Sequence, residues 1–251
     1  MGDEEAKAVE EVLKSGWIGL GPKTKEFEDQ FAKYVGAEYA VGVNSCTASL
    51  HLALKIMDIE GGEVITTPLT FVSTNHAIIY NKATPVFADI EEDTLNVSVR
   101  EIEKLITHKT KAVLVVHYGG HPCDLDSILA LAKSKGIKVV EDAAHACGAE
   151  YKDKKVGSIG DATCFSFHAV KNLATGDGGM ITVHTEDLAQ RIKRLSWMGI
   201  NRGTWERSGS RAYTWEYYVE ELGYKYHMND ITAAIGLVQL SKLESANARR
   251  R

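Results

Sequence analysis

The sequence has few of the features that mark membrane, nucleic-acid-binding or disulfide-rich proteins. No apolar run approaches the roughly 18 residues of a transmembrane helix, so we expect no membrane association. The four cysteines, at positions 46, 123, 147 and 164, form no Cys-x-x-Cys pair. That spacing predicts neither a metal site nor a disulfide framework and favours a cytoplasmic location. With 29 basic and 34 acidic residues, nucleic acid is not an expected partner, and the acidic start is unlike a signal peptide.

What the chain does contain is an alternation of short apolar strands with amphipathic helices. Segments such as 112–116 are apolar on both faces, which is typical of a mostly parallel sheet covered by helices. We therefore predict an α/β fold, whose seven strands lie at 39–43, 63–67, 84–88, 111–116, 137–141, 162–167 and 179–183. Helices are predicted at 4–14, 24–34, 47–57, 73–80, 98–106 and 124–135, after 184, and from Asn229 or Asp230, either of which can cap the last one.

Lys171 is the most informative single residue. It follows the apolar segment 162–167 and precedes glycines at 176, 178 and 179, and the strand 137–141 runs directly into Asp142. Pyridoxal phosphate (PLP) chemistry needs a lysine to hold the aldehyde carbon as a Schiff base and a carboxylate to keep the pyridine nitrogen protonated. Ligands of such sheets bind beyond the carboxyl ends of the strands, where both residues can meet. The alternative is a solvated loop lysine and an aspartate that merely ends a strand.

A cofactor phosphate needs several donors, and two segments can supply them. Residues 44–49 lie between a predicted strand and a helix, where free N–H groups and the helix dipole favour an anion and Thr47 adds a hydroxyl. Ser166, five residues before Lys171, is the second candidate. The alternatives are an ordinary helix N-cap and, for Ser166, a buried hydroxyl satisfied by a backbone carbonyl.

Two further side chains can contact a cofactor ring. Phe71 follows a predicted strand and can stack on the pyridine ring, and plain core packing is its alternative. His145 lies three residues after Asp142. It can sit over the ring or hydrogen-bond the ring's 3-hydroxyl, and the alternative is a satisfied structural histidine.

Taken in order, these segments resemble the DegT/DnrJ/EryC1/StrS family of PLP-dependent aminotransferases, which act mainly on nucleotide-linked keto sugars. The matching runs span nearly the whole chain and are GLGP (19–22) with EFE (26–28), SCTASL (45–50), TPLTF (67–71), HYGGHP (117–122) with Asp124, EDAAH (141–145), SFH (166–168) with Lys171, and GYKYHM (223–228).

The resemblance implies the fold-type-I, aspartate aminotransferase-like architecture and a homodimer whose active sites lie at the subunit interface. The implied catalytic residues are Lys171, Asp142 and His145. The implied cofactor-binding residues are Thr47, Ala48, Phe71, Asp142, His145, Ser166, Lys171 and, from the neighbouring subunit, Asn229.

The chain departs from the family pattern at several positions. Lysine replaces the usual asparagine at 225 and histidine the usual arginine at 227, so Lys225, His227 and Asn229 are all candidates for the ligand that crosses to the neighbour's phosphate. Cys46 stands where glycine is usual in the phosphate turn. Family members also continue into a C-terminal domain. We therefore expect an N-terminal helix and loop (1–22), a PLP-binding large domain (23–228), and the start of a helix that leads to a truncated C-terminal domain (229–251).

The predicted function is a ping-pong aminotransferase of amino-sugar and polysaccharide biosynthesis. It moves an amino group from an amino acid donor, L-glutamate, to a nucleotide-linked keto sugar, with Lys171 moving the proton. One alternative is a sugar dehydratase of the same superfamily, which carries histidine at the lysine position. Another is a non-catalytic PLP-binding or partner-binding module, which needs neither Lys171 nor Asp142. The loop Asn201–Tyr218 carries side chains that can meet a nucleotide diphosphate or remain solvated: Arg202, Trp205, Arg207 and Arg211.

Overall fold

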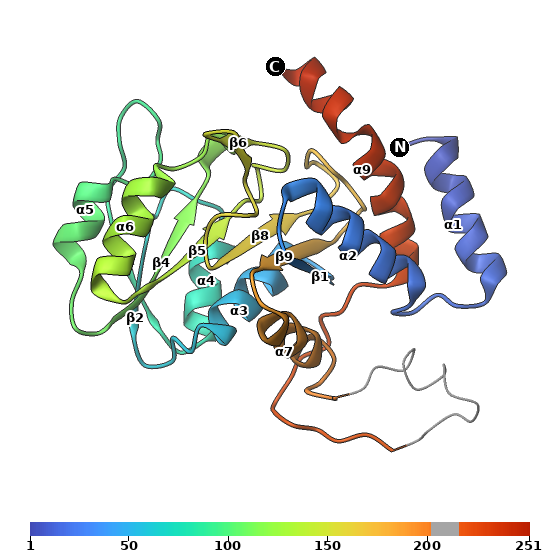
Figure 1. The fold of residues 1–251 in the computed structure, drawn as a ribbon, viewed down its shortest axis with the longest axis horizontal. Helices are drawn as coiled ribbons and strands as arrows, with labels where there is room; N and C mark the ends of the chain where they lie inside the picture. The colour runs from blue at the N-terminus through green and yellow to red at the C-terminus, as the bar shows by residue number, and fades with distance from the viewer. Residues whose placement is uncertain (202–215) are drawn as a thin grey trace.

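A seven-stranded sheet lies between two layers of helices in the computed structural model, which describes residues 1–201 and 216–251 (Figure 1). Its strands are β1 (Tyr39–Val43), β2 (Glu63–Thr66), β3 (Thr84–Phe87), β4 (Thr110–Val116), β5 (Lys138–Asp142), β8 (Ala162–Ser166) and β9 (Gly179–Val183). They are ordered β1-β9-β8-β5-β4-β2-β3. The strands from β8 to β3 pair in parallel, whereas β9 is antiparallel to both β1 and β8. The sequence-based expectation of seven strands in a mostly parallel sheet is confirmed.

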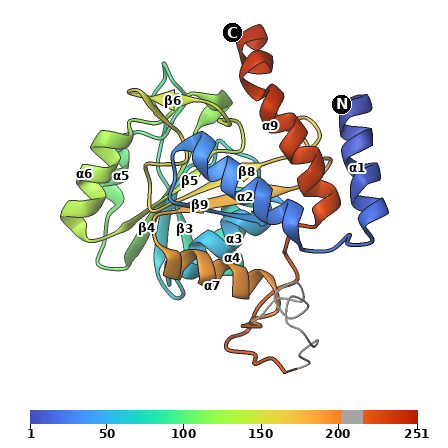
Figure 2. The same cartoon turned by 45° about the vertical axis from the view of Figure 1, so that its right-hand side comes forward.

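The helices cover both faces of this sheet. They are α1 (Asp3–Ser15), α2 (Pro22–Val35), α3 (Cys46–Ile56), α4 (Ser73–Tyr80), α5 (Val99–Leu105), α6 (Leu125–Lys135), α7 (Glu186–Ser196) and α9 (Asp230–Arg250). Along β4, Leu114 belongs to the buried cluster that includes residues of α3, α4 and α7, whereas its neighbours Val113 and Val115 belong to the cluster that includes residues of α5 and α6. This alternation is the two-residue period of a strand buried on both faces. Helices α2 and α9 cover the β1–β9–β8 end of the same face as α5 and α6 (Figure 2).

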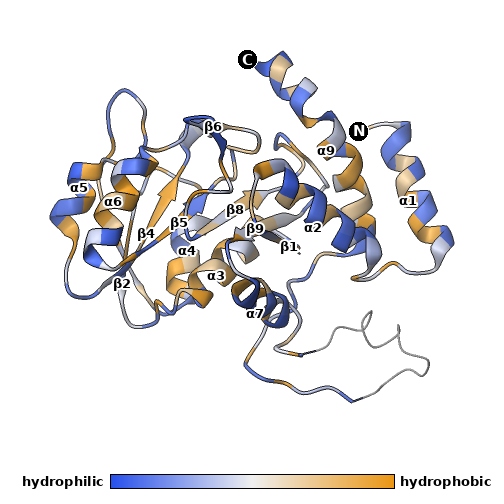
Figure 3. Cartoon of the chain, in the orientation of Figure 1, coloured by the Kyte–Doolittle hydropathy of each residue, from blue (hydrophilic) through white to orange (hydrophobic). Residues whose placement is uncertain are grey.

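Hydropathy follows the layering (Figure 3). Helix α3 is apolar over most of its circumference and is buried, with Leu50, Leu52 and Leu54 all fully inaccessible. A helix of that composition belongs in a core. Helix α7 has a hydrophilic outer face. Its buried residues are Ala189, Ile192, Leu195 and Ser196. No helix among the described residues is long and apolar enough to cross a membrane.

A capping interaction joins α2, early in the chain, to the start of α9, about 200 residues later. The N-terminus of α2 has no cap from its own Gly21; instead Asp230, at the start of α9, accepts hydrogen bonds from the backbone N–H groups of Lys23 (3.1 Å) and Thr24 (2.9 Å). Asp230 is almost fully buried. A carboxylate at a helix N-terminus satisfies orphan N–H groups and complements the helix dipole. This contact fixes α9 against α2.

Three local features differ from the expectations or decide between them. Pro22, expected in a loop, is the first residue of α2, where its missing N–H costs nothing. Asn229 rather than Asp230 caps α9, since its side chain accepts from the N–H of Thr232 at 2.9 Å. A two-residue hairpin of β6 (Glu150–Tyr151) and β7 (Lys154–Lys155) was not predicted. Strands this short carry no detectable alternation.

Candidate active site

The predicted site residues converge because of strand register. Val43 at the end of β1 pairs with Gly179 on β9, and Gly179 pairs with Ser166 at the end of β8. One strand further, Asp142 at the end of β5 pairs with Cys164. The carboxyl ends of β1, β8 and β5 therefore lie at one edge of the sheet, which is where open α/β sheets bind ligands.

Gly179 permits the close approach of β9 to the turn that follows β1. A Cβ atom at this position would lie 2.6 Å from the backbone carbonyl oxygen of Ser45 and 2.7 Å from Oγ of Ser49. Any side chain would therefore push the turn away from the sheet. The glycine keeps the N-terminus of α3 against the strand that pairs with Ser166.

The turn itself ends in a capped helix. Ser45 is the N-cap of α3, and its Oγ accepts the N–H of Ala48 at 3.1 Å. The N–H groups of Cys46 and Thr47 in the first turn have no partner among the described residues. These two amides can therefore receive an anion. The alternative for residues 44–49 was an ordinary helix N-cap. That cap is present, because the Ala48 N–H already donates to Ser45. Ala48 as a phosphate ligand stays a prediction.

Asp142 is nearly buried, with 5% of its surface exposed. Its Oδ1 accepts the N–H of Ala144 at 3.1 Å, and its Oδ2 accepts the hydroxyl of Thr74 at 2.7 Å. Both donors are neutral. Because a carboxylate has about four acceptor positions, this arrangement leaves room for a further donor such as a protonated ring nitrogen.

Lys171 follows β8 in a tight turn in which its N–H bonds the carbonyl of His168 at 2.9 Å. Its side chain is half-buried, and Nζ makes no hydrogen bond or ion pair with the described residues. The positive charge of Lys171 and the negative charge of Asp142 both act on Cys46 and on His145. These four side chains therefore share one neighbourhood, as the sequence predicts for Lys171, Asp142 and His145.

The surroundings of His145 favour its neutral form by lowering the pKa of its ring. Partial burial lowers the pKa of its ring, and the charge of Lys171 lowers this pKa further, against a smaller opposing effect of Asp142. The ring makes no hydrogen bond with the described residues, so the alternative of a satisfied structural histidine receives no support. The backbone of His145 lies close to Gly120, which has φ +87°. A Cβ atom at Gly120 would lie 2.6 Å from the carbonyl oxygen of His145, so a side chain there would displace this backbone.

Phe71 does not pack in the core. Its side chain is 76% exposed, so core packing, the alternative weighed for this residue, is wrong. Ser166 is almost buried, and its Oγ accepts a long bond of 3.4 Å from the N–H of His168 instead of donating to a backbone carbonyl. Both side chains remain available to a ligand, and their roles stay predictions.

The segment Lys225–Asn229 lies beside the same turn within its own chain. The carbonyl of Tyr226 accepts the N–H of Asn44 at 2.7 Å. His227 forms an isolated antiparallel β-bridge with Val43. Nζ of Lys225 lies 3.2 Å from the ring centroid of Trp197. Asn229 caps α9, which is the plain structural role weighed against phosphate binding. Whether any of these residues reaches a neighbouring subunit stays a prediction.

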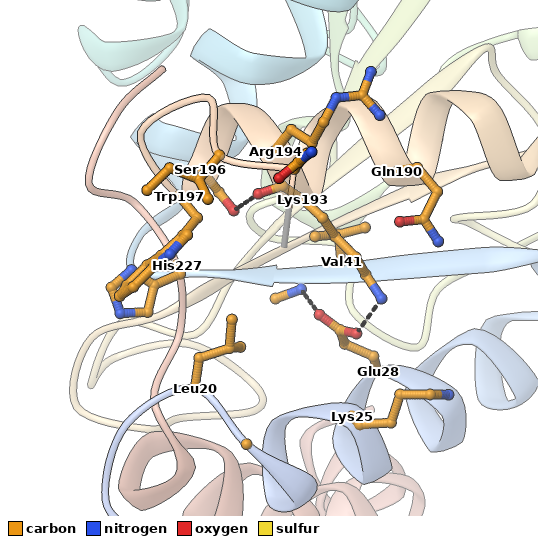
Figure 4. Close-up of a pocket in the computed structure, with 14 residues that line it drawn as sticks. Leu20, Lys25, Glu28, Val41, Gln190, Lys193, Arg194, Ser196, Trp197 and His227 are labelled. Atoms are coloured by element: carbon orange, nitrogen blue, oxygen red, sulfur yellow. Dashed lines mark hydrogen bonds and ion pairs between the residues drawn. The ribbon is translucent and has the colours of Figure 1, made fainter. Parts of the chain in front are cut away.

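A separate cavity of about 120 Å³ lies between α2, β1 and α7 (Figure 4). At its base the buried carboxylate of Glu28 accepts the N–H of Gly42 at 2.9 Å and pairs with Lys193 at 3.1 Å. Burial raises the pKa of Glu28, and Lys193 opposes the rise. None of the predicted catalytic residues lines this cavity, although His227 does. In the described part of the chain, no three His, Cys, Asp or Glu side chains gather to hold a metal ion.

Comparison with known proteins identifies the family. The model of the DegT/DnrJ/EryC1/StrS aminotransferase family matches residues 1–251. The chain belongs to this family. It is 53% identical over 251 residues to the spore coat polysaccharide biosynthesis protein SpsC of Bacillus subtilis and 51% identical to an uncharacterized protein of Methanocaldococcus jannaschii. The chain spans 64% and 65% of the lengths of these two curated relatives, respectively.

Solved structures of family relatives agree with the fold. Spr1654 of Streptococcus pneumoniae in its PLP form matches with a TM-score of 0.90 at 35% identity, covering 98% of this chain and 65% of that one. Helicobacter pylori PseC, an aminotransferase involved in the biosynthesis of pseudoaminic acid, matches with a TM-score of 0.88 at 32% identity, covering 97% of this chain and 64% of that one. The fold-type-I architecture expected from the family resemblance is therefore confirmed.

Several residues that shape the site escaped the sequence analysis. Thr74 and the buried pair His117–Glu141 hold the end of β5, but they contact their partners across 68 and 24 positions of sequence. The family-like runs contain His117 and Glu141, yet nothing in the runs indicates that the two side chains meet. The candidate nucleotide contacts Arg202, Trp205, Arg207 and Arg211 lie outside the described residues.

Proposed function

We propose that the protein is a PLP-dependent aminotransferase that moves an amino group from L-glutamate to a nucleotide-linked keto sugar. Family membership and the PLP and PMP forms of Spr1654 support the cofactor and the reaction class. The similarity to a spore coat polysaccharide biosynthesis protein supports a sugar substrate. The nucleotide and the glutamate donor rest on the family resemblance.

One observation carries the proposal, namely the arrangement of Lys171 and Asp142 at a single edge of the sheet. Lys171 offers an Nζ without a partner among the described residues, and Asp142 offers a buried carboxylate held by two neutral donors. The amides of Cys46 and Thr47 add an anion site at the start of α3. An aldehyde, a ring nitrogen and a phosphate each find a suitable group here, so the residues present fit PLP.

The cofactor, when bound, supplies an electron sink that stabilises negative charge on the carbon that carries the amino group. The protein's own residues do the rest. With the cofactor bound, Nζ of Lys171 would hold the aldehyde carbon and would afterwards carry the proton to and from the donor's α-carbon. Asp142 would hold the proton on the ring nitrogen. His145 and Phe71 would contact the ring, and the α3 amides with Thr47 and Ser166 would hold the phosphate.

The same site supports assembly into a homodimer. Large apolar side chains are exposed around α4 and at the end of the neighbouring edge strand β3: Phe71, Val72, Ile79, Tyr80 and Phe87, each at least half exposed. Exposed apolar groups gathered in this way mark an interaction surface. Phe71 belongs both to this surface and to the proposed cofactor site, so a second copy docked here completes the wall of the pocket.

The function is tested with PLP-loaded protein and its substrates. Incubation with L-glutamate alone should yield one 2-oxoglutarate per site, as a ping-pong scheme requires. A panel of nucleotide keto sugars added afterwards should then identify the acceptor through the appearance of an amino sugar. The Lys171→Ala variant is the matched control and should yield neither product. Absence of 2-oxoglutarate from loaded wild-type protein would contradict the proposal.

A further inference from the structure

The carboxylate of Asp142 is held by a pair of threonine hydroxyls. Oγ1 of Thr74 lies 2.7 Å from Oδ2 of Asp142, and Oγ1 of Thr70 lies 2.7 Å from Oγ1 of Thr74. Thr74 is fully buried, and 5% of Asp142 is exposed. The two threonines lie four residues apart around the start of α4, and the loop between them carries Phe71.

The directions of these bonds follow from counting hydrogens. A hydroxyl has one hydrogen to donate. Because a carboxylate can only accept hydrogen bonds, Thr74 donates its hydrogen to Oδ2 of Asp142. Thr70 must then donate to Thr74. The result is a directed relay, Thr70 to Thr74 to Asp142, in which each hydroxyl is fixed by the next.

The relay replaces the usual roles of a threonine in a first helical turn. A buried helical threonine commonly bonds a carbonyl one turn back, and a threonine at a helix start commonly caps it. Thr74 does neither, and α4 begins without a side-chain cap. Since Thr74 is the second residue of α4, its bond also brings the carboxylate to the positive end of that helix.

The geometry points to Thr74 as a positioning residue for the aminotransfer reaction, with Thr70 as its support; this inference rests on the proposed function. By fixing Oδ2, Thr74 aims the remaining lone pairs of Asp142 toward the place where the ring nitrogen of the cofactor would lie. The relay also links Asp142 to the Phe71 loop, so that the ring's nitrogen partner and the side chain against its face are set by one short segment.

The test compares four variants of the whole chain, each loaded with PLP labelled with ¹⁵N in the ring. Thr74→Val removes the donor while keeping the shape, Thr74→Ser restores the hydroxyl, and Thr70→Val removes only the support. Thr66→Val is the matched control, because Thr66 is also fully buried but its hydroxyl has no partner among the described residues. The readouts are the ¹⁵N resonance of the pyridine nitrogen and the single-turnover rate with L-glutamate.

We expect Thr74→Val to move the nitrogen resonance toward that of unprotonated pyridine and to slow the single turnover about tenfold to a hundredfold, by analogy with the loss of hydrogen-bond partners that orient metal ligands. Thr70→Val should give a smaller shift in the same direction and carries the test if Thr74→Val does not fold. Thr74→Ser and Thr66→Val should resemble the wild type.

A wild-type resonance and a rate within twofold in both Thr74→Val and Thr70→Val would overturn the inference while leaving the proposed function intact. An equal loss in Thr66→Val would also overturn it, because the effect would then belong to any buried threonine in this sheet edge. A wild type that takes up no cofactor on Lys171 would instead overturn the proposed function, and the inference with it.

Discussion

Glu141 accepts a hydrogen bond of 2.8 Å from Nε2 of His117, and both side chains are completely buried. Nδ1 of His117 accepts the N–H of Cys123 at 3.1 Å, so the ring carries its hydrogen on Nε2 and donates it to Glu141. The other oxygen of Glu141 accepts the N–H of Gly160 at 2.6 Å and the hydroxyl of Thr163 at 2.8 Å. This network ties together the ends of β4 and β5 and the start of β8, next to Asp142.

Removing Glu141 should therefore be severely destabilising. Glu141→Ala leaves three buried donors without an acceptor, and we expect the free energy of unfolding to fall by about 3–5 kcal/mol. Urea denaturation followed by circular dichroism measures this change. The control is Glu10→Ala, which breaks an exposed pair with Lys14 on α1 and should cost less than about 0.5 kcal/mol. Equal losses in the two variants would refute the structural role given to Glu141.

The protein should lose stability in mild acid through His227. Burial, with a further contribution from Lys225, lowers the pKa of the His227 ring from 6.5 to about 4. Between these values the unfolded chain binds a proton that the folded chain does not, so the free energy of unfolding falls as the pH drops through this window. A pKa difference of this size corresponds to about 3–4 kcal/mol, and solvent screening of this half-buried ring makes the measured change smaller.

Urea titrations at several pH values between 7.5 and 4 measure this effect. His227→Phe should flatten the pH dependence by the contribution of this ring. Lys225→Met removes the weaker cause and should reduce the fall only in part. If the wild type and His227→Phe lose stability in parallel over this range, His227 is not the group responsible.

Much of the fold and the centre of the site could be predicted from sequence because their signals are local. Each of the seven strands was recognised as a short run between turns, Asp142 ends one of them, and Lys171 lies five residues after the end of another. The contacts that were not predicted join distant segments. Thr74 meets Asp142 across 68 positions, and Asp230 caps α2 across 206. Periodicity and spacing cannot report such pairs, because they depend on which strands become neighbours in the sheet.

Asp142→Asn should leave the cofactor bound but remove most aminotransfer. An amide cannot keep the ring nitrogen protonated, so the rate should fall about a hundredfold to a thousandfold, or about 3–4 kcal/mol. Single-turnover absorbance changes with L-glutamate measure the rate, and cofactor titration measures binding. The matched control is Asp126→Asn at an exposed position on α6, which should be unchanged. Near wild-type turnover in Asp142→Asn would contradict the role of this carboxylate.

The segment Lys225–Asn229 should complete the site of a neighbouring subunit. One inactive parent carries Lys171→Ala. The other carries Lys225→Ala, His227→Ala and Asn229→Ser, since serine preserves the cap of α9 while removing the amide. Mixed dimers contain one site with both parts intact, so activity should return to about a quarter of the wild-type value if the subunits exchange at random.

Subunit exchange in these mixtures is verified with two differently sized affinity tags. Mixtures that exchange fully and stay inactive would show that each subunit completes its own site. In that case the contacts of Asn44 with the 225–226 backbone would describe the working position of this segment.

The most direct test of the account is to find where PLP attaches. Protein incubated with PLP is reduced with borohydride, digested and mapped by mass spectrometry. The account predicts one pyridoxyl group per chain, on Lys171, and none on any lysine of the loaded Lys171→Ala variant. A pyridoxyl group on another lysine, or an unlabelled chain after loading, would contradict the claim that Lys171 and Asp142 form the centre of a PLP site.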